Sequence, residues 1–244
     1  MATGDVKLLG SCASPFVLRV KIALNIKSIN YEFIQENVNN KSELLLKSNP
    51  IHKKIPVLFH GDNNPICESI IIVEYINDVW STIGPSILPS NPHDRSLARF
   101  WAAYIDNKLF AAFRELKNSK WVEAIEGVVN KIVEGFLVLE DVFIKCSKGK
   151  QFFGGETIGL IDIALGSGLP WFKVLERMSN KKLLDETKMP NIVAWADNFC
   201  QDPLVKGDLP DVEKLFELYT TMFMVKEQVA VLETKYSPSN SIDG

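Results

Sequence analysis

The stretch from Asn49 to Tyr75 constrains this chain most, because it combines a proline-marked strand, a hairpin and a helix start. Residues 55–59 (IPVLF) are typical of a strand, yet Pro56 has no N–H to give to a sheet ladder. Pro56 therefore belongs at a strand edge or in a tight bend with a cis bond. The proline forces Ile55 into an extended conformation, so we expect the backbone groups of Ile55 to be free to pair with something else.

The rest of this stretch predicts a hairpin and then a helix. Residues 61–64 (GDNN) suit a hairpin loop that leads into a short strand at 65–67. Glu68 and Ser69 stand where a helix must begin, because apolar residues recur at helical spacing after them: Ile72, Ile76, Val79 and Trp80. A strand edge with free backbone beside an open helix N-terminus can hold a small, extended peptide that carries a carboxylate.

The first eighty residues predict a compact mixed sheet. Strands are expected at 6–9 and 30–34, a helix from Ser14 to about Ile26, and a short helix at 39–47. With the hairpin and helix above, the order is βαβαββα, and a strand, helix and strand in sequence imply a right-handed parallel crossover. We expect helices on both faces of this sheet.

Ser14 begins the first helix. A serine before Pro15 is a strong helix start, and capping alone would explain it. A functional role would need a thiol substrate near the helix N-terminus, where the hydroxyl could donate a hydrogen bond to a thiolate and the helix dipole would favour its charge. The periodicity buries most of this helix and is expected to turn Arg19 and Lys21 outward.

A second, all-helical domain is expected after a linker. Residues 82–94 are polar and rich in proline and glycine, which separates a domain at 1–81 from one at 95–226. Helices are predicted at about 98–116, 119–145, from beyond 155 to 177, 190–199 and 211–226, packed as a bundle. Asp162 is expected to reach back to backbone amides at a helix start. A tail at 227–244 is expected to be partly disordered.

Composition excludes several classes of function. The net charge of −3 gives no support to nucleic-acid binding. No apolar run is long enough for a membrane span and no secretory signal is visible, so a cytoplasmic protein is expected. The four cysteines are widely spaced and only three histidines occur, which favours reduced thiols and no metal site.

Four motifs resemble those of plant tau-class glutathione transferases: SPF (14–16), NPIHKKIPVL (49–58), PICESIIIVEYI (65–76) and RFWAAYIDNK (99–108). The resemblance covers roughly the whole chain to about residue 225. It implies a thioredoxin-like, glutathione-binding first domain with Pro56 cis, and an enzyme that conjugates glutathione to hydrophobic electrophiles. Glutathione would be a co-substrate, with no other cofactor, and a homodimer is implied.

The resemblance also assigns roles to individual residues. Ser14 would be the catalytic hydroxyl, and glutathione would lie along Ile55 with its γ-glutamyl carboxylate at Glu68 and Ser69. The remaining glutathione-site residues would be Phe16, Lys41, Lys54 and Pro56. The hydrophobic-substrate site would be lined by Phe110, Arg114, Trp171, Leu218 and Met222. Phe110 departs from the family's frequent tyrosine, which removes a hydroxyl from that site.

Other functions stay open at this point. The same thiolate could reduce organic hydroperoxides, and a non-catalytic carrier of hydrophobic metabolites would keep the pocket without needing Ser14. In redox-active relatives of this fold the reactive cysteine lies directly before the proline, but here that place is Ser14 and Cys12 lies two residues earlier. Disulfide exchange or dehydroascorbate reduction is therefore disfavoured.

Overall fold

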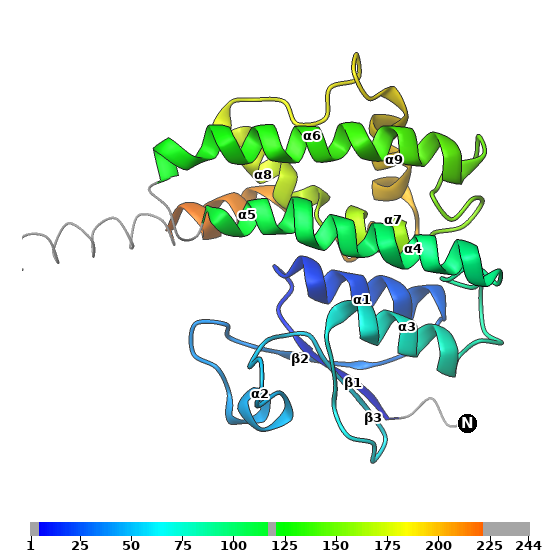
Figure 1. Ribbon diagram of the computed structural model, residues 1–244. Coiled ribbons are helices and arrows are strands. Elements are labelled where there is room, and N and C mark those ends of the chain that lie inside the picture. Colours follow the sequence, from blue (N-terminus) through cyan, green and yellow to red (C-terminus); the bar gives the residue numbers. More distant parts are fainter. Residues whose placement is uncertain (1–4, 117–120, 222–244) are drawn as a thin grey trace, which may run out of the picture.

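The structure is a computed structural model that describes residues 5–116 and 121–221. Its first domain is built on a four-stranded mixed sheet with the strand order β2-β1-β3-β4 (Figure 1). The strands are β1 (Val6–Gly10), β2 (Glu32–Gln35), β3 (Val57–His60) and β4 (Ile66–Cys67). β1 runs parallel to β2 and antiparallel to β3, and β3 runs antiparallel to β4. The predicted βαβαββα order is confirmed.

Helices cover both faces of this sheet, as the alternation of apolar residues along its strands requires. Leu8 and Leu58 point to the face covered by α1 (Pro15–Ile26) and α3 (Ser69–Val79). Their neighbours Leu9 and Val57 point to the other face, where Leu45 of α2 (Glu43–Ser48) packs against them. In Figure 1, α1 and α3 lie between the sheet and the second domain, and α2 lies on the opposite side of the sheet.

This layering makes the predicted orientation of Arg19 and Lys21 wrong. Arg19 is fully buried, because α1 is covered by the sheet on one side and by the second domain on the other. Lys21 is only 12% exposed at its side chain and forms an ion pair with Asp208, with Nζ 3.1 Å from Oδ1. A helix that lies between two layers has little surface left for free charges.

The second domain is helical. Its elements are α4 (Pro92–Ile105), the π-helical turn η1 (Asp106–Phe110), α5 (Ala111–Glu115), α6 (Trp121–Ser147), α7 (Leu160–Gly166), α8 (Leu169–Ser179), α9 (Pro190–Gln201) and a helical segment at 212–221. α4 begins inside the segment expected as a linker, since Oδ1 of Asn91 caps it by accepting hydrogen bonds from the amides of His93 and Asp94. The predicted tail and the end of the last predicted helix lie outside the described residues.

Two predicted helices are interrupted. The expected helix at 98–116 contains the π turn η1, in which the amide of Ala111 donates to the carbonyl of Asp106, five residues earlier. The expected helix that ends near 177 breaks between α7 and α8, where Gly168 lies against two aromatic rings. A Cβ atom there would lie 2.7 Å from the ring of Phe172 and 2.9 Å from the ring of Phe110.

Asp162 binds backbone amides at the start of α7, as predicted. Its carboxylate accepts hydrogen bonds from the amides of Phe153 (2.8 Å), Gly154 (2.9 Å) and Gly159 (2.8 Å). A fourth bond comes from the indole Nε1 of Trp195 in α9, at 2.8 Å. This buried carboxylate therefore joins the loop before α7, the helix itself and α9.

Candidate functional site

The sheet register brings the main predicted site segments to one end of the first domain. Gly10 pairs with Gln35, Leu9 with Val57, and Val57 with Cys67. The loops that follow β1 and β2, the segment that precedes β3 and the segment that follows β4 therefore all leave the sheet at the same end. These are the segments that carry Ser14, Lys41, Ile55 and Glu68.

Ser14 is the N-cap of α1, and its side chain is weakly bound there. Oγ accepts a hydrogen bond from the amide of Val17 at 3.4 Å, which is long for an N–H···O bond. The Ser14 amide donates to the carbonyl of Ser11 at 3.0 Å, and its carbonyl accepts from Leu18 at 3.1 Å. The half-buried hydroxyl thus lies at the positive end of a helix, with no acceptor for its proton within residues 5–116 and 121–221.

The segment before β3 has the geometry that the sequence predicts. The Ile55–Pro56 peptide bond is cis, Pro56 is buried and Ile55 is half-buried. β3 begins only at Val57, so Ile55 lies outside the sheet ladder. Its backbone is therefore available to an extended ligand.

Asn49 positions the loop that leads to Ile55, a role that the sequence reading missed. The Asn49 side chain is 4% exposed, and its Nδ2 donates to the carbonyl of Lys54 at 2.9 Å. Its Oδ1 accepts from the amide of His52 at 3.1 Å. The Asn-Pro pair at 49–50, a common turn signal, could have pointed to this residue.

Glu68 and Ser69 lie at the start of α3 but differ in exposure. Glu68 is exposed and has φ of 70°, the left-handed region that a non-glycine residue adopts at a cost. Its Oε1 lies 4.0 Å from Nε2 of His52. Ser69 is 7% exposed, and its Oγ accepts a hydrogen bond from Nη1 of Arg19 at 3.2 Å.

The two lysines assigned by the resemblance are surface residues. Lys41 and Lys54 are both exposed, and the ion pairs within the described parts of the chain involve neither of them. Both side chains have the freedom to turn toward a bound carboxylate. The structure shows no contact between them.

Arg19 links this site to the second domain, which sequence reasoning did not foresee. Its guanidinium bonds to both carboxylate oxygens of Asp106 in η1, at 3.1 and 2.6 Å. In α7 it donates to the carbonyl of Ala164 at 3.0 Å and in the following turn to Oγ of Ser167 at 3.2 Å. Together with the bond to Ser69, these contacts satisfy a fully buried cation across both domains.

Aromatic rings enclose the same guanidinium. Its carbon lies 5.0 Å from the ring centroid of Phe16 in α1 and 4.9 Å from that of Phe110 in η1. These two rings are 5.2 Å apart, and Phe110 is 6.0 Å from Phe172. Phe110 is only 4% exposed, so it lies between the domains among other aromatic side chains.

The other residues assigned to the hydrophobic-substrate site lie on α5, α8 and the last helical segment. Arg114 is exposed, and its Nη2 donates to the carbonyl of Asp106 at 3.3 Å. Leu218 is 42% exposed. Met222 lies outside the described residues.

Trp171 of α8 contacts the loop that carries Ser14. Its indole Nε1 donates to the carbonyl of Ala13 at 2.8 Å. The half-buried ring lies edge-on to Phe113, at 5.7 Å between centroids, and to Tyr219, at 5.8 Å. Trp171 therefore lies directly beside the start of α1.

The cysteines are all free, and three of them are partly buried. Burial raises the pKa of Cys67, Cys146 and Cys200, which makes them poor thiolates. Cys12 is exposed, and its Sγ lies 3.7 Å from Oε1 of Gln35. Among the described residues no three His, Cys, Asp or Glu side chains are grouped so that they could hold a metal ion.

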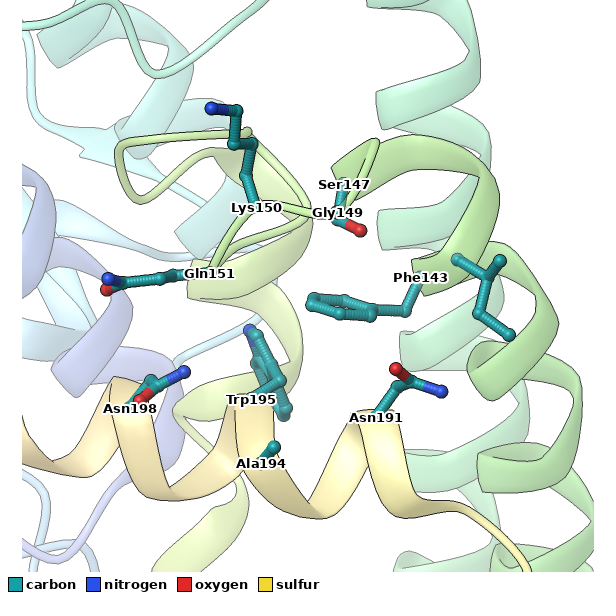
Figure 2. A pocket seen from close by; sticks show the side chains of 10 residues that line it. Phe143, Ser147, Gly149, Lys150, Gln151, Asn191, Ala194, Trp195 and Asn198 are labelled. Atoms are coloured by element: carbon teal, nitrogen blue, oxygen red, sulfur yellow. The ribbon is translucent and has the colours of Figure 1, made fainter.

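A hollow of about 230 Å³ lies far from Ser14, between the end of α6, the loop after it and α9. Figure 2 shows Phe143 and Trp195 beside it, with the amide side chains of Gln151, Asn191 and Asn198 around them. None of the residues assigned by the resemblance lines it. Within the described ranges, no helix has both the length and the apolar character that crossing a membrane would need.

Comparisons with known proteins agree with this architecture. Residues 4–78 match the family "Glutathione S-transferase, N-terminal domain". Glutathione S-transferase U17 of Arabidopsis thaliana is 56% identical over 91% of this chain and 98% of its own length. The tau-class glutathione S-transferase of mango, Mangifera indica, has a structure with a TM-score of 0.84 and 51% identity over 90% of this chain and 99% of its own. A rice glutathione S-transferase solved in complex with glutathione has a TM-score of 0.78 and 32% identity over 90% of this chain and 98% of its own.

The identities extend across both domains, and the fold, the cis proline before β3 and the helix start at Ser14 all occur where the motifs place them. The chain therefore belongs to the plant tau class of the glutathione S-transferase family.

Proposed function

We propose that this glutathione S-transferase conjugates glutathione to small hydrophobic electrophiles, with the Ser14 hydroxyl stabilising the attacking thiolate. The observation that carries the proposal is the position of Ser14, whose half-buried Oγ lies at the N-terminus of α1 with its proton uncommitted in the described residues. A helix N-terminus and a hydroxyl donor both favour a negatively charged sulfur.

The tripeptide would lie along the end of the sheet where the register gathers the site segments. Ile55, outside the ladder, would offer backbone groups to the cysteinyl residue of glutathione. Glu68 would receive the α-ammonium of the γ-glutamyl group, whose carboxylate would meet the start of α3 at Ser69. The exposed Lys41 and Lys54 would bind the glycyl carboxylate. Binding of glutathione itself is supported by the rice relative, which was solved in complex with it.

In the reaction the thiolate sulfur attacks an electrophilic carbon of the second substrate. A carbon–sulfur bond forms and, for an aryl halide, halide leaves with the bonding electrons. A free thiol has a pKa of about 8.5, so lowering it by one unit near neutral pH raises the thiolate fraction several-fold. The apolar ring of Phe16 would face the electrophile. So would four residues on η1, α5, α8 and 212–221: Phe110, Arg114, Trp171 and Leu218.

Replacement of the hydroxyl tests this proposal. In Ser14→Ala, conjugation of a chromogenic chlorodinitrobenzene should fall at least about tenfold, because a hydrogen bond to a charged group is lost. Binding of S-methylglutathione, which has no ionisable thiol, should change little. Ser14→Thr is the matched control, since it keeps a hydroxyl that can cap the helix. Unchanged turnover in Ser14→Ala would refute the role of Ser14, and faster turnover with organic hydroperoxides than with the aryl halide would favour a peroxidase.

A homodimer is also proposed. Exposed apolar side chains lie along α3 and α4 on either side of the Glu74–Arg99 ion pair: Ile71 (58% exposed), Leu97 (41%) and Phe100 (58%). Large apolar side chains that stay exposed beside an ion pair between two helices are typical of a surface that associates with another protein. A second copy of this chain is the partner that the resemblance implies.

A further inference from the structure

We infer that Trp171 is a positioning residue for Ser14, through the hydrogen bond that its indole donates to the carbonyl of Ala13. The inference rests on the proposed function, because it assumes that the Ser14 hydroxyl stabilises the thiolate. It adds a residue of the second domain that determines where this hydroxyl lies. The resemblance offers Trp171 only as part of the wall of a hydrophobic-substrate site.

The peptide unit just before Ser14 is held at both of its ends. Its N–H, from Ser14, donates to the carbonyl of Ser11 at 3.0 Å within the same loop. Its C=O, from Ala13, accepts from Nε1 of Trp171 at 2.8 Å. Because a peptide unit is planar, these two bonds fix the plane from which the Ser14 side chain projects.

Contacts on the helix side hold the hydroxyl less firmly. The bond from the Val17 amide to Oγ is 3.4 Å long, and on the other side Sγ of the exposed Cys12 lies 3.7 Å from Oε1 of Gln35. The Trp171 bond is shorter than either of these. It therefore contributes more to the position of the loop than these two contacts do.

The second domain in turn fixes the indole. Its ring lies edge-on to Phe113 of α5 and to Tyr219 of the segment 212–221, at 5.7 and 5.8 Å. Ala13 and Trp171 belong to the same apolar cluster as the buried Val174, Leu215 and Tyr219. Three helical segments thus set the direction of the indole N–H: α8, α5 and 212–221. Through the hydrogen bond to Ala13, these segments also determine the position of the loop before α1.

Small errors in the placement of a catalytic group have large effects on rate. Loss of the Trp171–Ala13 bond frees the Ala13–Ser14 peptide to rotate and lets the hydroxyl move away from the sulfur. The consequence is a higher pKa for the bound glutathione thiol. The rest of the tripeptide should bind with little change, because its proposed contacts are on Ile55, Glu68 and Ser69.

The test compares Trp171→Phe, which removes the N–H but keeps an aromatic ring, with Phe113→Leu, which alters the same ring cluster but keeps the indole N–H that Ala13 accepts. The thiolate of bound glutathione is titrated by its ultraviolet absorbance, and kcat and KM for glutathione are measured at the same pH values. In Trp171→Phe we expect kcat to fall about two- to tenfold, the effect of losing one hydrogen bond. The thiolate fraction measured at pH values below the thiol pKa should fall by the same factor. KM for glutathione should stay nearly unchanged. Phe113→Leu should shift the thiolate titration by less than Trp171→Phe does, because the indole N–H and its contact with Tyr219 remain.

The results separate the inference from the proposed function. If Ser14→Ala raises the thiol pKa but Trp171→Phe titrates like the native enzyme, or if Phe113→Leu shifts the titration equally, the role of Trp171 is refuted and that of Ser14 stands. If Ser14→Ala itself leaves the titration unchanged, the proposed function fails first. The melting temperature of each variant is measured alongside, so that a loss of folded protein is not taken for a shifted pKa.

Discussion

The Nη2 atom of Arg19 lies 2.6 Å from Oδ1 of Asp106, and this ion pair joins the two domains with the arginine side chain completely covered. Burying a guanidinium is unfavourable unless charge and hydrogen bonds compensate it. Here the compensation comes from both sides of the domain interface, through Ser69 in the first domain and Asp106, Ala164 and Ser167 in the second. The hydrogen bonds and the ion pair of Arg19 can therefore all form only when the two domains are packed against each other.

We predict that Asp106→Asn lowers the free energy of unfolding by about 3 kcal/mol, because it leaves a buried cation without its counter-charge. The matched control is Glu74→Gln, which removes the partner of Arg99 from a pair whose side chains are 49% and 23% exposed. Its cost should stay below about 1 kcal/mol. Urea denaturation of both variants measures the difference. If both variants lose the same free energy of unfolding, the buried Arg19–Asp106 pair contributes no more to stability than the exposed pair does.

Asp162 should contribute to the pH dependence of the free energy of unfolding. Burial raises the pKa of its carboxyl from 3.8 to about 6, against the hydrogen bonds from the Gly159, Phe153 and Gly154 amides, which act to lower it. The folded state therefore holds the proton more tightly than the unfolded state. The stabilisation from this proton is complete below pH 3.8 and is lost as the pH rises to about 6.

We therefore expect the unfolding free energy of the native chain, minus that of Asp162→Asn, to fall by up to about 3 kcal/mol between pH 4 and pH 6. Taking the difference removes the groups that titrate alike in both proteins. Chemical denaturation at half-unit steps of pH measures it. A difference that rises with pH would mean that the four donors around the carboxylate outweigh its burial.

The proposed homodimer predicts a specific effect at Phe100. Phe100→Ser should shift the native species toward the monomer, because it removes an apolar side chain that is 58% exposed beside the Glu74–Arg99 pair. Ile144→Ser on α6 is the control, as Ile144 is 53% exposed but lies on a different helix. Sedimentation at several protein concentrations gives the mass of each. A native chain that sediments as a monomer would contradict the proposal outright.

The sequence predicts local features well because short-range chemistry determines them. The βαβαββα order of elements along the chain follows from apolar alternation interrupted by glycine and proline. The cap at Ser14 and the reach of Asp162 toward nearby amides need only a few neighbouring residues. The cis bond at Pro56 was among the two arrangements that a proline near a strand allows.

The features that the sequence did not predict depend on packing between segments that are distant in the chain. Helical periodicity shows that α1 has an apolar face, but it does not show that a second domain covers the opposite one, so Arg19 was misplaced. The π turn η1 depends instead on packing within the second domain, which helical periodicity does not show either. Leu109 within it packs where α6 has Gly135, and a Cβ atom at Gly135 would lie 2.6 Å from the Leu109 side chain.

The π turn also has a consequence for changes in chain length. Such a turn accommodates one residue more than an α-helix does, so losing one residue between Asp106 and Phe110 would restore α geometry without breaking the helix. Each residue of an α-helix turns the chain by about 100°, and the π turn spreads nearly the same rotation over one residue more, so α5 would keep Phe113 and Arg114 on the side where they now lie. A single-codon deletion at this turn is thus a change of length that the second domain can absorb, whereas the same deletion within a regular part of α4 would turn every residue after it.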